Sequence, residues 1–282
     1  MNILITGCTG FIGSNILNKF QKNNKIYIIL RNKKDNKKFK YKNIKIINYK
    51  NYDELNKKIS KIKVESIIHT ATHYAKTHNQ KDLKEFSNSN ILFGNIILEN
   101  IEKMNVSKFI NFTTVWENYN GKKNSPHNLY AFYKKTYSEL IKFYEKKYKN
   151  TNFYNLIIAD TFGANDKRKK LITVIRKNYK GNKISKITSS RLNINLLNVK
   201  DIVKAVKIIL SRKINPSTYN LSNNTYNIKK LIDHFNLKNK KKIRVKFLSN
   251  KLINEKVYKF KNLPNWRPMY TSINEICKVI KL

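Results

Sequence analysis

The sequence predicts an α/β protein in which a parallel β-sheet is covered by helices on both of its faces. Short apolar runs alternate along the chain with longer stretches whose apolar residues recur at helical spacing. The short runs are apolar throughout, as strands are when both faces of a sheet are buried. The first run leads directly into a glycine-rich turn and then a helix, which is the order found in doubly wound sheets that bind phosphate groups.

Each expected element is bounded by polar or turn residues. The expected strands are residues 2–6, 25–31, 44–48, 66–70, 108–113 and 153–159. The expected helices between them are residues 11–20, 52–62, 83–104 and 130–148. After about Ala159 the pattern becomes less regular. We therefore expect a sheet domain over residues 1–158 and a smaller lobe over residues 159–282, from which residues 193–212, with a helix at 201–209, return to the sheet domain.

Length and composition indicate a globular protein of the cytoplasm. The chain has 282 residues, of which 40% are hydrophobic, enough for a sizeable core. No apolar run approaches the roughly 18 residues of a membrane span, and the N-terminus lacks the basic leader and cleavage site of a signal peptide. The two cysteines, Cys8 and Cys277, are too few for a disulfide framework, so a reducing cytoplasm is the expected location.

The formal net charge of +42 is extreme and raises the question of nucleic-acid binding. The lysines are spread over nearly every segment rather than gathered on one tail or stripe, which favours a solvated surface over a dedicated nucleic-acid site. The positive field still favours a substrate that carries a diphosphate. His69 and His73 follow a strand without a carboxylate or thiol cluster, so no metal site is expected.

The turn after the first expected strand has the spacing of a dinucleotide-binding motif. Residues 7–13 read GCTGFIG, which is G-x-x-G-x-x-G between a strand and a helix. Gly7 permits the tight turn, Gly10 lets the backbone approach a pyrophosphate, and Gly13 lets helix and strand pack closely. The helix dipole and free N–H groups favour the anion. The expected cofactor contacts in this turn are Gly7, Thr9, Gly10, Phe11, Ile12 and Gly13.

The end of the second expected strand bears on the choice between NAD and NADP. NAD-preferring enzymes commonly place an acid near this point to hold the ribose 2′-hydroxyl. Here Arg31 stands at this point instead, and the first acid after it is Asp35. A guanidinium pairs well with a 2′-phosphate, so NADP is favoured over NAD.

Tyr130 and Lys134 are the candidate catalytic pair, because they lie one turn apart on one face of an expected helix. A nearby ammonium favours the phenolate and is expected to lower the pKa of the tyrosine. Lysine also suits a hydrogen bond to the cofactor ribose. Tyr119 and Lys123 share the same spacing, but Tyr130 stands at the start of the helix that follows the fifth strand.

A hydroxyl ends that fifth strand, where parallel sheets bind ligands. Thr114 is expected to hydrogen-bond a substrate carbonyl as negative charge develops on its oxygen. Thr113 is the alternative carrier of this role.

Taken together, these motifs resemble the extended short-chain dehydrogenases/reductases, the NAD-dependent epimerase/dehydratase family. The run IIHTAT at 67–72 resembles the family's fourth strand and its His-x-Ala turn, which implies that Thr70, Ala71 and Thr72 line the cofactor cleft. Asn90 and Ile91 resemble the Asn-Val pair that opens the next helix, which makes Asn90 a cofactor-site residue. Further matches, with departures in substrate-facing loops, are DTFGAND at 160–166, residues 196–201 and NWRP at 265–268.

The resemblance implies a Rossmann-type sheet domain and a C-terminal lobe that binds a nucleotide-diphosphate sugar. Within the family, the chain looks most like the 4-keto-sugar reductases that make CDP-linked dideoxyhexoses, such as abequose and paratose synthases. The expected reaction is NAD(P)H-dependent reduction of the 4-keto group of a nucleotide-linked 6-deoxy sugar, for a surface polysaccharide. The alternatives are a nucleotide-sugar epimerase with the same catalytic residues and, in another class, a non-catalytic RNA-binding scaffold.

The resemblance also bears on dehydration and on assembly. A 4,6-dehydratase of this family follows its strand-end threonine with Asp-Glu, whereas Val115 and Trp116 follow Thr114 here, and Glu117 is one residue too far along. Dehydration is therefore not expected. The family resemblance further implies a homodimer built on the helix that carries Tyr130 and its neighbour.

Overall fold

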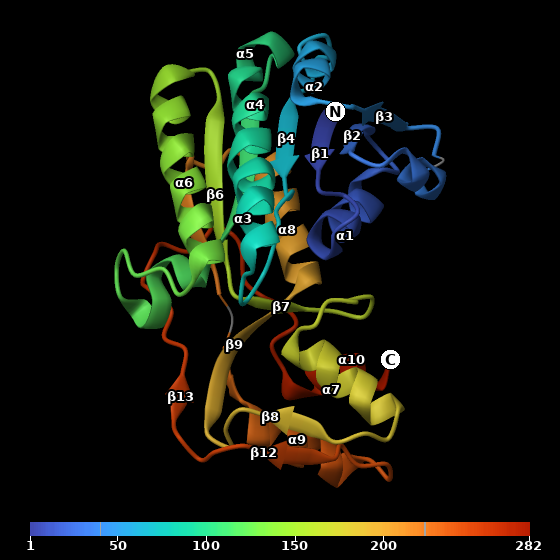
Figure 1. Ribbon diagram of the computed structural model, residues 1–282, viewed down its shortest axis with the longest axis vertical. Helices are drawn as coiled ribbons and strands as arrows, with labels where there is room; N and C mark the ends of the chain where they lie inside the picture. Colours follow the sequence, from blue (N-terminus) through green and yellow to red (C-terminus); the bar gives the residue numbers. More distant parts are fainter. Residues whose placement is uncertain (40, 223) are drawn as a thin grey trace.

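A seven-stranded parallel sheet forms the centre of the larger lobe of the computed structural model, which describes residues 1–39, 41–222 and 224–282 (Figure 1). Its strand order is β10-β6-β5-β4-β1-β2-β3, and every neighbouring pair is parallel. The strands are β1 (Asn2–Thr6), β2 (Lys25–Leu30), β3 (Ile44–Asn48), β4 (Ser66–His69), β5 (Lys108–Thr114), β6 (Asn152–Ile158) and β10 (Ser217–Leu221). The order runs outward in both directions from β1 and β4, which confirms the predicted doubly wound α/β class.

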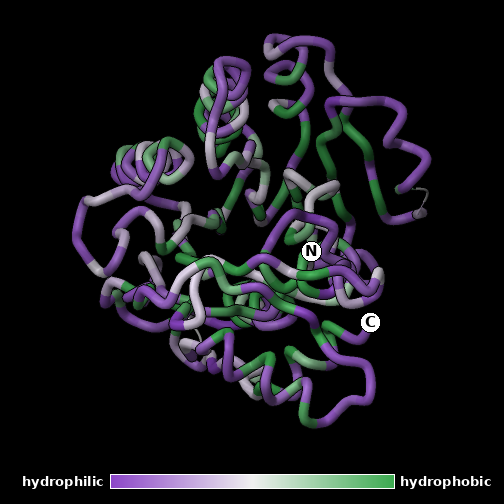
Figure 2. The backbone as a smooth tube through the Cα atoms, turned by 60° about the horizontal axis from the view of Figure 1, so that its bottom comes forward, coloured by the Kyte–Doolittle hydropathy of each residue, from purple (hydrophilic) through white to green (hydrophobic). Residues whose placement is uncertain are grey.

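Helices cover both faces of the sheet, and alternate residues of β1 show why. Ile3 and Ile5 pack in one buried apolar cluster with residues of α1 and α8, whereas Leu4 belongs to a second cluster with residues of α2, α4 and α6. In Figure 2, hydrophobic residues (green) lie mainly along interior segments of the chain, and hydrophilic residues (purple) lie along the outer turns. These helices are α1 (Phe11–Phe20), α2 (Tyr52–Ile59), α4 (Phe93–Glu99), α6 (Leu129–Lys147) and α8 (Val199–Ser211).

The long helix expected over 83–104 is divided into shorter segments. It begins earlier, at α3 (Gln80–Phe86), because Asn79 and Asp82 form a reciprocal capping box. A π-helical stretch (Ser87–Leu92) separates α3 from α4, and a short α5 (Ile101–Met104) follows. Asn105 ends α5 in a left-handed conformation, with φ of 59°.

The second lobe has its own sheets and its own core. β9 pairs with β7, β11 and β13 in one sheet, and β8 pairs with β12 in another. Its apolar cluster includes Phe162, Ile175, Phe235 and Ile280. The elements are β7 (Asp160–Phe162), α7 (Leu171–Lys180), β8 (Ser185–Ile187), β9 (Leu192–Asn198), β11 (Thr225–Asn227), α9 (Ile228–Lys238), β12 (Val245–Phe247), β13 (Ile253–Asn254) and α10 (Ile273–Lys281).

Residues 193–212, which we expected to return to the sheet domain, divide between the two lobes. β9 belongs to the second lobe's sheet, so this part of the expectation was wrong. α8 does return, since its Ile202 and Val206 share the apolar cluster of Ile3 and Ile5. β10 then adds a seventh strand beside β6, which the sequence pattern did not reveal.

Three further properties concern the described ranges only. No helix in them is long and apolar enough to cross a membrane. No group of three or more His, Cys, Asp or Glu side chains in them could hold a metal ion. Cys8 and Cys277 are free thiols, and both are buried.

Candidate active site

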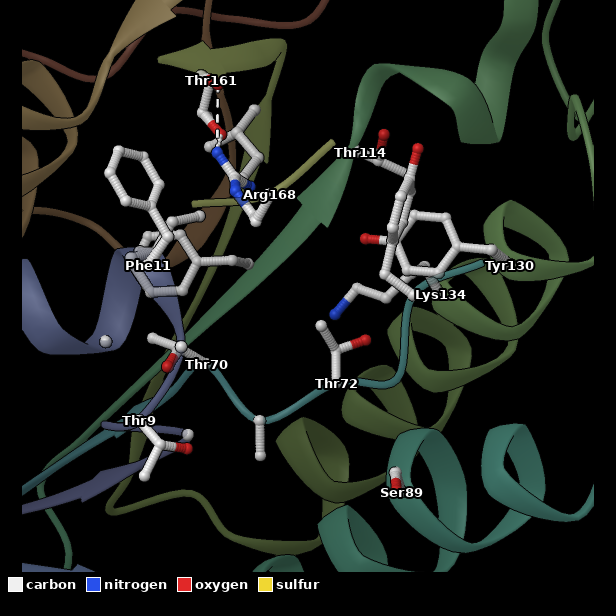
Figure 3. A pocket seen from close by; sticks show the side chains of 18 of the residues that line it. Thr9, Phe11, Thr70, Thr72, Ser89, Thr114, Tyr130, Lys134, Thr161 and Arg168 are labelled. Atoms are coloured by element: carbon white, nitrogen blue, oxygen red, sulfur yellow. Dashed lines mark hydrogen bonds between the residues drawn. The ribbon is translucent and has the colours of Figure 1, made fainter. Parts of the chain in front are cut away.

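A cavity of about 460 Å³ lies where the central strands end, between the sheet domain and the second lobe. This is the edge at which doubly wound sheets bind ligands. Figure 3 shows Thr114, Tyr130 and Lys134 on one side, and Phe11, Thr9 and Thr70 on the other, with Arg168 next to Phe11 and Thr161. Every sequence-predicted site residue except Asn90 lines the cavity: Gly7, Thr9, Gly10, Phe11, Ile12, Gly13, Arg31, Thr70, Ala71, Thr72, Thr114, Tyr130 and Lys134.

The three glycines of the turn have different structural roles. Gly7 has a φ of 70°, and a Cβ there would lie 2.5 Å from the Ala71 nitrogen. A Cβ on Gly13 would lie 2.3 Å from the Gly7 carbonyl oxygen, so β1 and α1 could not pack as they do. A Cβ on Gly10 would meet only that oxygen, at 3.2 Å. The protein itself therefore demands Gly7 and Gly13, whereas Gly10 leaves its side open toward the cavity.

The N-terminus of α1 carries no side-chain cap, since Gly10 stands at its N-cap position. The first N–H groups of the helix are thus left for an anion. The open side of Gly10 and these N–H groups fit the pyrophosphate of a dinucleotide cofactor.

Arg31 lies at the end of β2 and lines the cavity, but it already has an anionic partner. Its Nη1 is 3.3 Å from Glu85 Oε2 and 3.4 Å from Ser89 Oγ. The side chain is 66% exposed, so this pairing is weak and open to exchange. Asp35, the first acid after Arg31 in the sequence, also lines the cavity.

Asn90 lies behind the cavity wall rather than in it. Its Oδ1 accepts hydrogen bonds from the backbone N–H of His73 at 2.6 Å and from the Thr72 hydroxyl at 3.2 Å, and its amide donates to the His73 carbonyl. Asn90 therefore holds the 72–73 loop, and through it Thr72, in position. The sequence placed Asn90 among the cofactor contacts; the structure gives it a positioning role.

Tyr130 and Lys134 project into the cavity from the first turns of α6. The helix begins at Leu129 because the Asn128 side chain caps it, accepting from the Ala131 N–H at 3.0 Å. The Tyr130 ring meets the Tyr74 ring edge to face, with centroids 4.9 Å apart.

The pKa of Tyr130 departs from the sequence expectation. Burial raises it to about 12, and the positive charges that oppose this rise belong to Lys170 and Arg168. We expected Lys134 to lower the pKa of Tyr130 below its ordinary value. This was wrong, because desolvation of the buried phenol outweighs the effect of the nearby cations. Burial also lowers the pKa of Lys134 to about 8, against the opposing effect of the Glu117 carboxylate.

Thr114 and Thr113 both line the cavity at the end of β5. The Thr114 hydroxyl accepts a hydrogen bond from the Trp116 N–H at 3.3 Å, so its own proton is free to be donated. Thr113 is 2% exposed, and its hydroxyl has no hydrogen-bond partner among the described residues. The Thr113 hydroxyl is thus buried, which leaves Thr114 as the better placed donor to a ligand oxygen.

The structure adds several cavity residues that sequence reasoning missed. Asp160, Arg168 and Lys170 line the cavity from the start of the second lobe, and Tyr74 and Trp116 join them. Arg168 is held by Asp166 and Thr161, and its guanidinium stacks 4.4 Å from the Phe11 ring centroid. Lysines were expected on a solvated surface throughout the chain. Lys170 lines the site only because the second lobe packs against the sheet domain.

The chain belongs to the NAD dependent epimerase/dehydratase family, whose model matches residues 3–222. It is similar to the CDP-abequose synthase of Yersinia pseudotuberculosis, with 28% identity over 223 residues, which cover 75% of this chain and 74% of that protein. It is also similar to the CDP-abequose synthase of Salmonella muenchen, with 26% identity over 222 residues, covering 78% and 73%. The recognised family resemblance is thereby confirmed, and the protein is an enzyme of this NAD-dependent family.

Solved structures share the fold at low sequence identity. The UDP-glucuronic acid 4-epimerase of Bacillus cereus, solved with NAD, has a TM-score of 0.82 and 17% identity, covering 100% of this chain and 99% of that one. The dTDP-glucose 4,6-dehydratase of Bacillus anthracis, also in complex with NAD, has a TM-score of 0.78 and 20% identity, covering 100% and 96%. At these identities, the likeness establishes the Rossmann-type architecture and not the reaction.

Proposed function

We propose that this protein uses NAD(P)H to reduce the 4-keto group of a nucleotide-diphosphate 6-deoxy sugar. The observation that supports the proposal most directly is the shared cavity. Tyr130, Lys134 and Thr114 line the same space as the glycine turn, so a cofactor on the turn and a substrate carbonyl can meet there. The two similar curated proteins, both CDP-abequose synthases, favour a nucleotide-linked deoxy sugar and a role in making a surface polysaccharide.

The chain's own residues can carry the proton chemistry. Bound NAD(P)H supplies the hydride to the keto carbon. The raised pKa keeps Tyr130 protonated at neutral pH, so its hydroxyl can donate a proton to the oxygen that becomes the product alcohol. Lys134 hydrogen-bonds the cofactor ribose, and the positive charges of Lys170 and Arg168 favour the phenolate that remains. The Thr114 hydroxyl donates to the same carbonyl oxygen and stabilises its developing charge.

Dehydration is disfavoured by the residues after Thr114. Val115 and Trp116 line the cavity there, and neither side chain can transfer a proton. Glu117 is 7% exposed and accepts a hydrogen bond from Ser138 at 3.3 Å, away from the cavity lining. No acid and base pair therefore follows the strand-end threonine.

A preference for NADP over NAD is part of the proposal. Arg31 is the cation at the end of β2, and its bond to Glu85 is exposed enough for a 2′-phosphate to replace the carboxylate. Asp35 also lines the cavity and would suit a ribose hydroxyl instead. Measured affinities for the two reduced cofactors decide between these residues.

The decisive experiment is a screen of 4-keto nucleotide sugars with the loss of NADPH or NADH absorbance as the signal. We expect one equivalent of reduced cofactor to be consumed for each sugar converted. An epimerase would regenerate its own cofactor. Conversion of a 4-hydroxy nucleotide sugar into its epimer without net cofactor change would therefore replace the reductase assignment with that of an epimerase.

We also propose a homodimer through α6 and the neighbouring α3–α4 segment. These elements expose large apolar side chains: Leu83, Leu92, Phe132 and Phe143. Apolar patches of this kind mark association surfaces. Light scattering after gel filtration should give twice the 33.4 kDa chain mass, and a single-chain mass would refute the dimer.

A further inference from the structure

An ion pair from the second lobe faces the cavity beside the reacting tyrosine. Lys170 Nζ lies 2.7 Å from Asp160 Oδ1, and both side chains line the cavity. The ammonium stands over two aromatic rings, 4.5 Å from the Tyr74 centroid and 5.2 Å from the Trp116 centroid. These aromatic rings and Asp160 hold the ammonium in one place on the cavity wall.

Tyr74 connects this pair to the reacting group. Its ring packs edge to face on Tyr130 and carries the Lys170 ammonium on its face. Lys170 is also the positive charge that most strongly opposes the raised pKa of Tyr130. The pair therefore lies next to the position at which Tyr130 meets a substrate oxygen.

The pair is too well enclosed to be explained as a surface bridge. The side chain of Lys170 is 16% exposed and that of Asp160 is 23% exposed. Removing two charges from water is costly, and an apolar pair would fill this space at lower cost. An ammonium has three N–H donors, and Asp160 and the Tyr74 side chain take two of them, which leaves one for a ligand. The pair thus presents a donor and an acceptor side by side to whatever occupies the cavity.

The charges around the pair disfavour an anionic group at this point. Asp160 already neutralises Lys170, and Glu255 lies close enough for the two carboxyls to interact. Burial, then Asp160, raises the pKa of Glu255 to about 7, while Lys170 and Lys76 oppose that rise. A diphosphate placed here would face one or two carboxylates, whereas a neutral hydroxyl can both donate to Asp160 and accept from Lys170.

We propose that Asp160 and Lys170 bind a ring hydroxyl of the substrate's sugar and so help to determine which sugars the enzyme accepts. The proposal rests on the proposed function, because it assigns the substrate beside Tyr130 to a sugar. It makes Lys170 a specificity-determining residue rather than a diphosphate ligand.

The test compares nucleotide sugars with the matching nucleoside diphosphates. Titration calorimetry on the protein saturated with NADP⁺ would measure CDP-glucose against CDP, UDP-glucose against UDP, and dTDP-glucose against dTDP. Lys170→Met should weaken binding of the favoured nucleotide sugar by about tenfold, the worth of one charge-assisted hydrogen bond, and leave its nucleoside diphosphate unchanged. Lys170→Arg should restore part of the loss, because it keeps the donor charge.

Two further variants keep the result decisive. Lys169→Met removes an exposed neighbouring charge and should change neither the affinity for the nucleotide sugar nor that for the nucleoside diphosphate. If Lys170→Met does not fold, Asp160→Asn tests the same pair, and it should also weaken the nucleotide sugar selectively. Equal losses for sugar and nucleoside diphosphate would assign the pair to the phosphates, and unchanged affinities would leave it a purely structural bridge; either result overturns the proposal.

The outcome for the proposed function can be read separately. If the variants show the selective loss but the wild-type protein reduces no 4-keto sugar, the sugar-binding pair is retained and the reductase assignment is lost. Wild-type protein that reduces a 4-keto sugar, with no selective effect in either variant, would retain the reductase and lose the pair.

Discussion

Glu117 and Lys134 are a buried carboxyl and a buried ammonium that act on one another, Lys134 in the cavity lining and Glu117 behind it. Burial raises the pKa of Glu117 to about 7 and lowers that of Lys134 to about 8, and each charge opposes the shift of the other. Glu117 follows Thr114 by three residues and accepts a hydrogen bond from Ser138 of α6. One carboxylate thus connects the segment that carries Thr114 with the helix that carries Lys134.

This relationship predicts a shifted pH profile for Glu117→Gln. The carboxylate favours the ammonium form of Lys134, so its loss should lower the pKa of Lys134 further below about 8. The ammonium is then lost at lower pH, and the high-pH limb of kcat/KM should move down by about one pH unit. Glu145→Gln, an exposed change on the same helix, is the control. An unmoved high-pH limb in Glu117→Gln would show that this carboxylate does not support Lys134.

Tyr130→Phe should bind cofactor as the wild type does but lower kcat by about 100-fold or more, because only the proton donor is removed. Fluorescence titration with NADPH and steady-state rates measure the two effects. Tyr133→Phe is a matched control, since its hydroxyl meets Ser87, 3.0 Å away, and it does not line the cavity. Wild-type turnover in Tyr130→Phe would show that Tyr130 is not the proton donor.

Gly10→Val should lower cofactor affinity, whereas Gly13→Ala should lower the stability of the fold. At Gly10 the new Cβ meets only the Gly7 oxygen at 3.2 Å, so the fold should persist while the side chain occupies the place of the pyrophosphate. Cofactor affinity should fall by at least about tenfold, with the melting temperature nearly unchanged. At Gly13 the Cβ would lie 2.3 Å from that oxygen, which should cost roughly 1–3 kcal/mol of unfolding free energy. Normal cofactor affinity in Gly10→Val would contradict the assigned phosphate site.

Arg31→Met should weaken NADPH binding by roughly tenfold and leave NADH almost unaffected, since only NADPH carries the 2′-phosphate. Glu85→Gln should act in the opposite direction. Freeing the guanidinium from its exposed partner should strengthen NADPH binding by about two- to fivefold. Equal effects on both cofactors would show that Arg31 does not read the 2′-phosphate.

The catalytic side of the site was predictable because its signals are local. The glycine spacing after β1, the strand-end Thr114 and the i, i+4 pair on α6 each lie within one short segment. The strands were predictable for the same reason, since burial on both faces leaves a continuous apolar run. Asn90 was found through the family resemblance, but its role behind the wall depends on a loop 17 residues away in sequence.

The sequence by itself determined the doubly wound sheet, the phosphate-binding turn and the position of the tyrosine and lysine. Only the tertiary structure decided that β9 leaves the large sheet, that β10 joins it, and that Asp160 and Lys170 face Tyr130. It also reversed the expected direction of the Tyr130 pKa, because desolvation depends on everything packed around a group and not on its helical neighbour alone. Periodicity and motif spacing are properties of one segment, whereas burial and the charges that meet across two lobes exist only once distant segments have packed together.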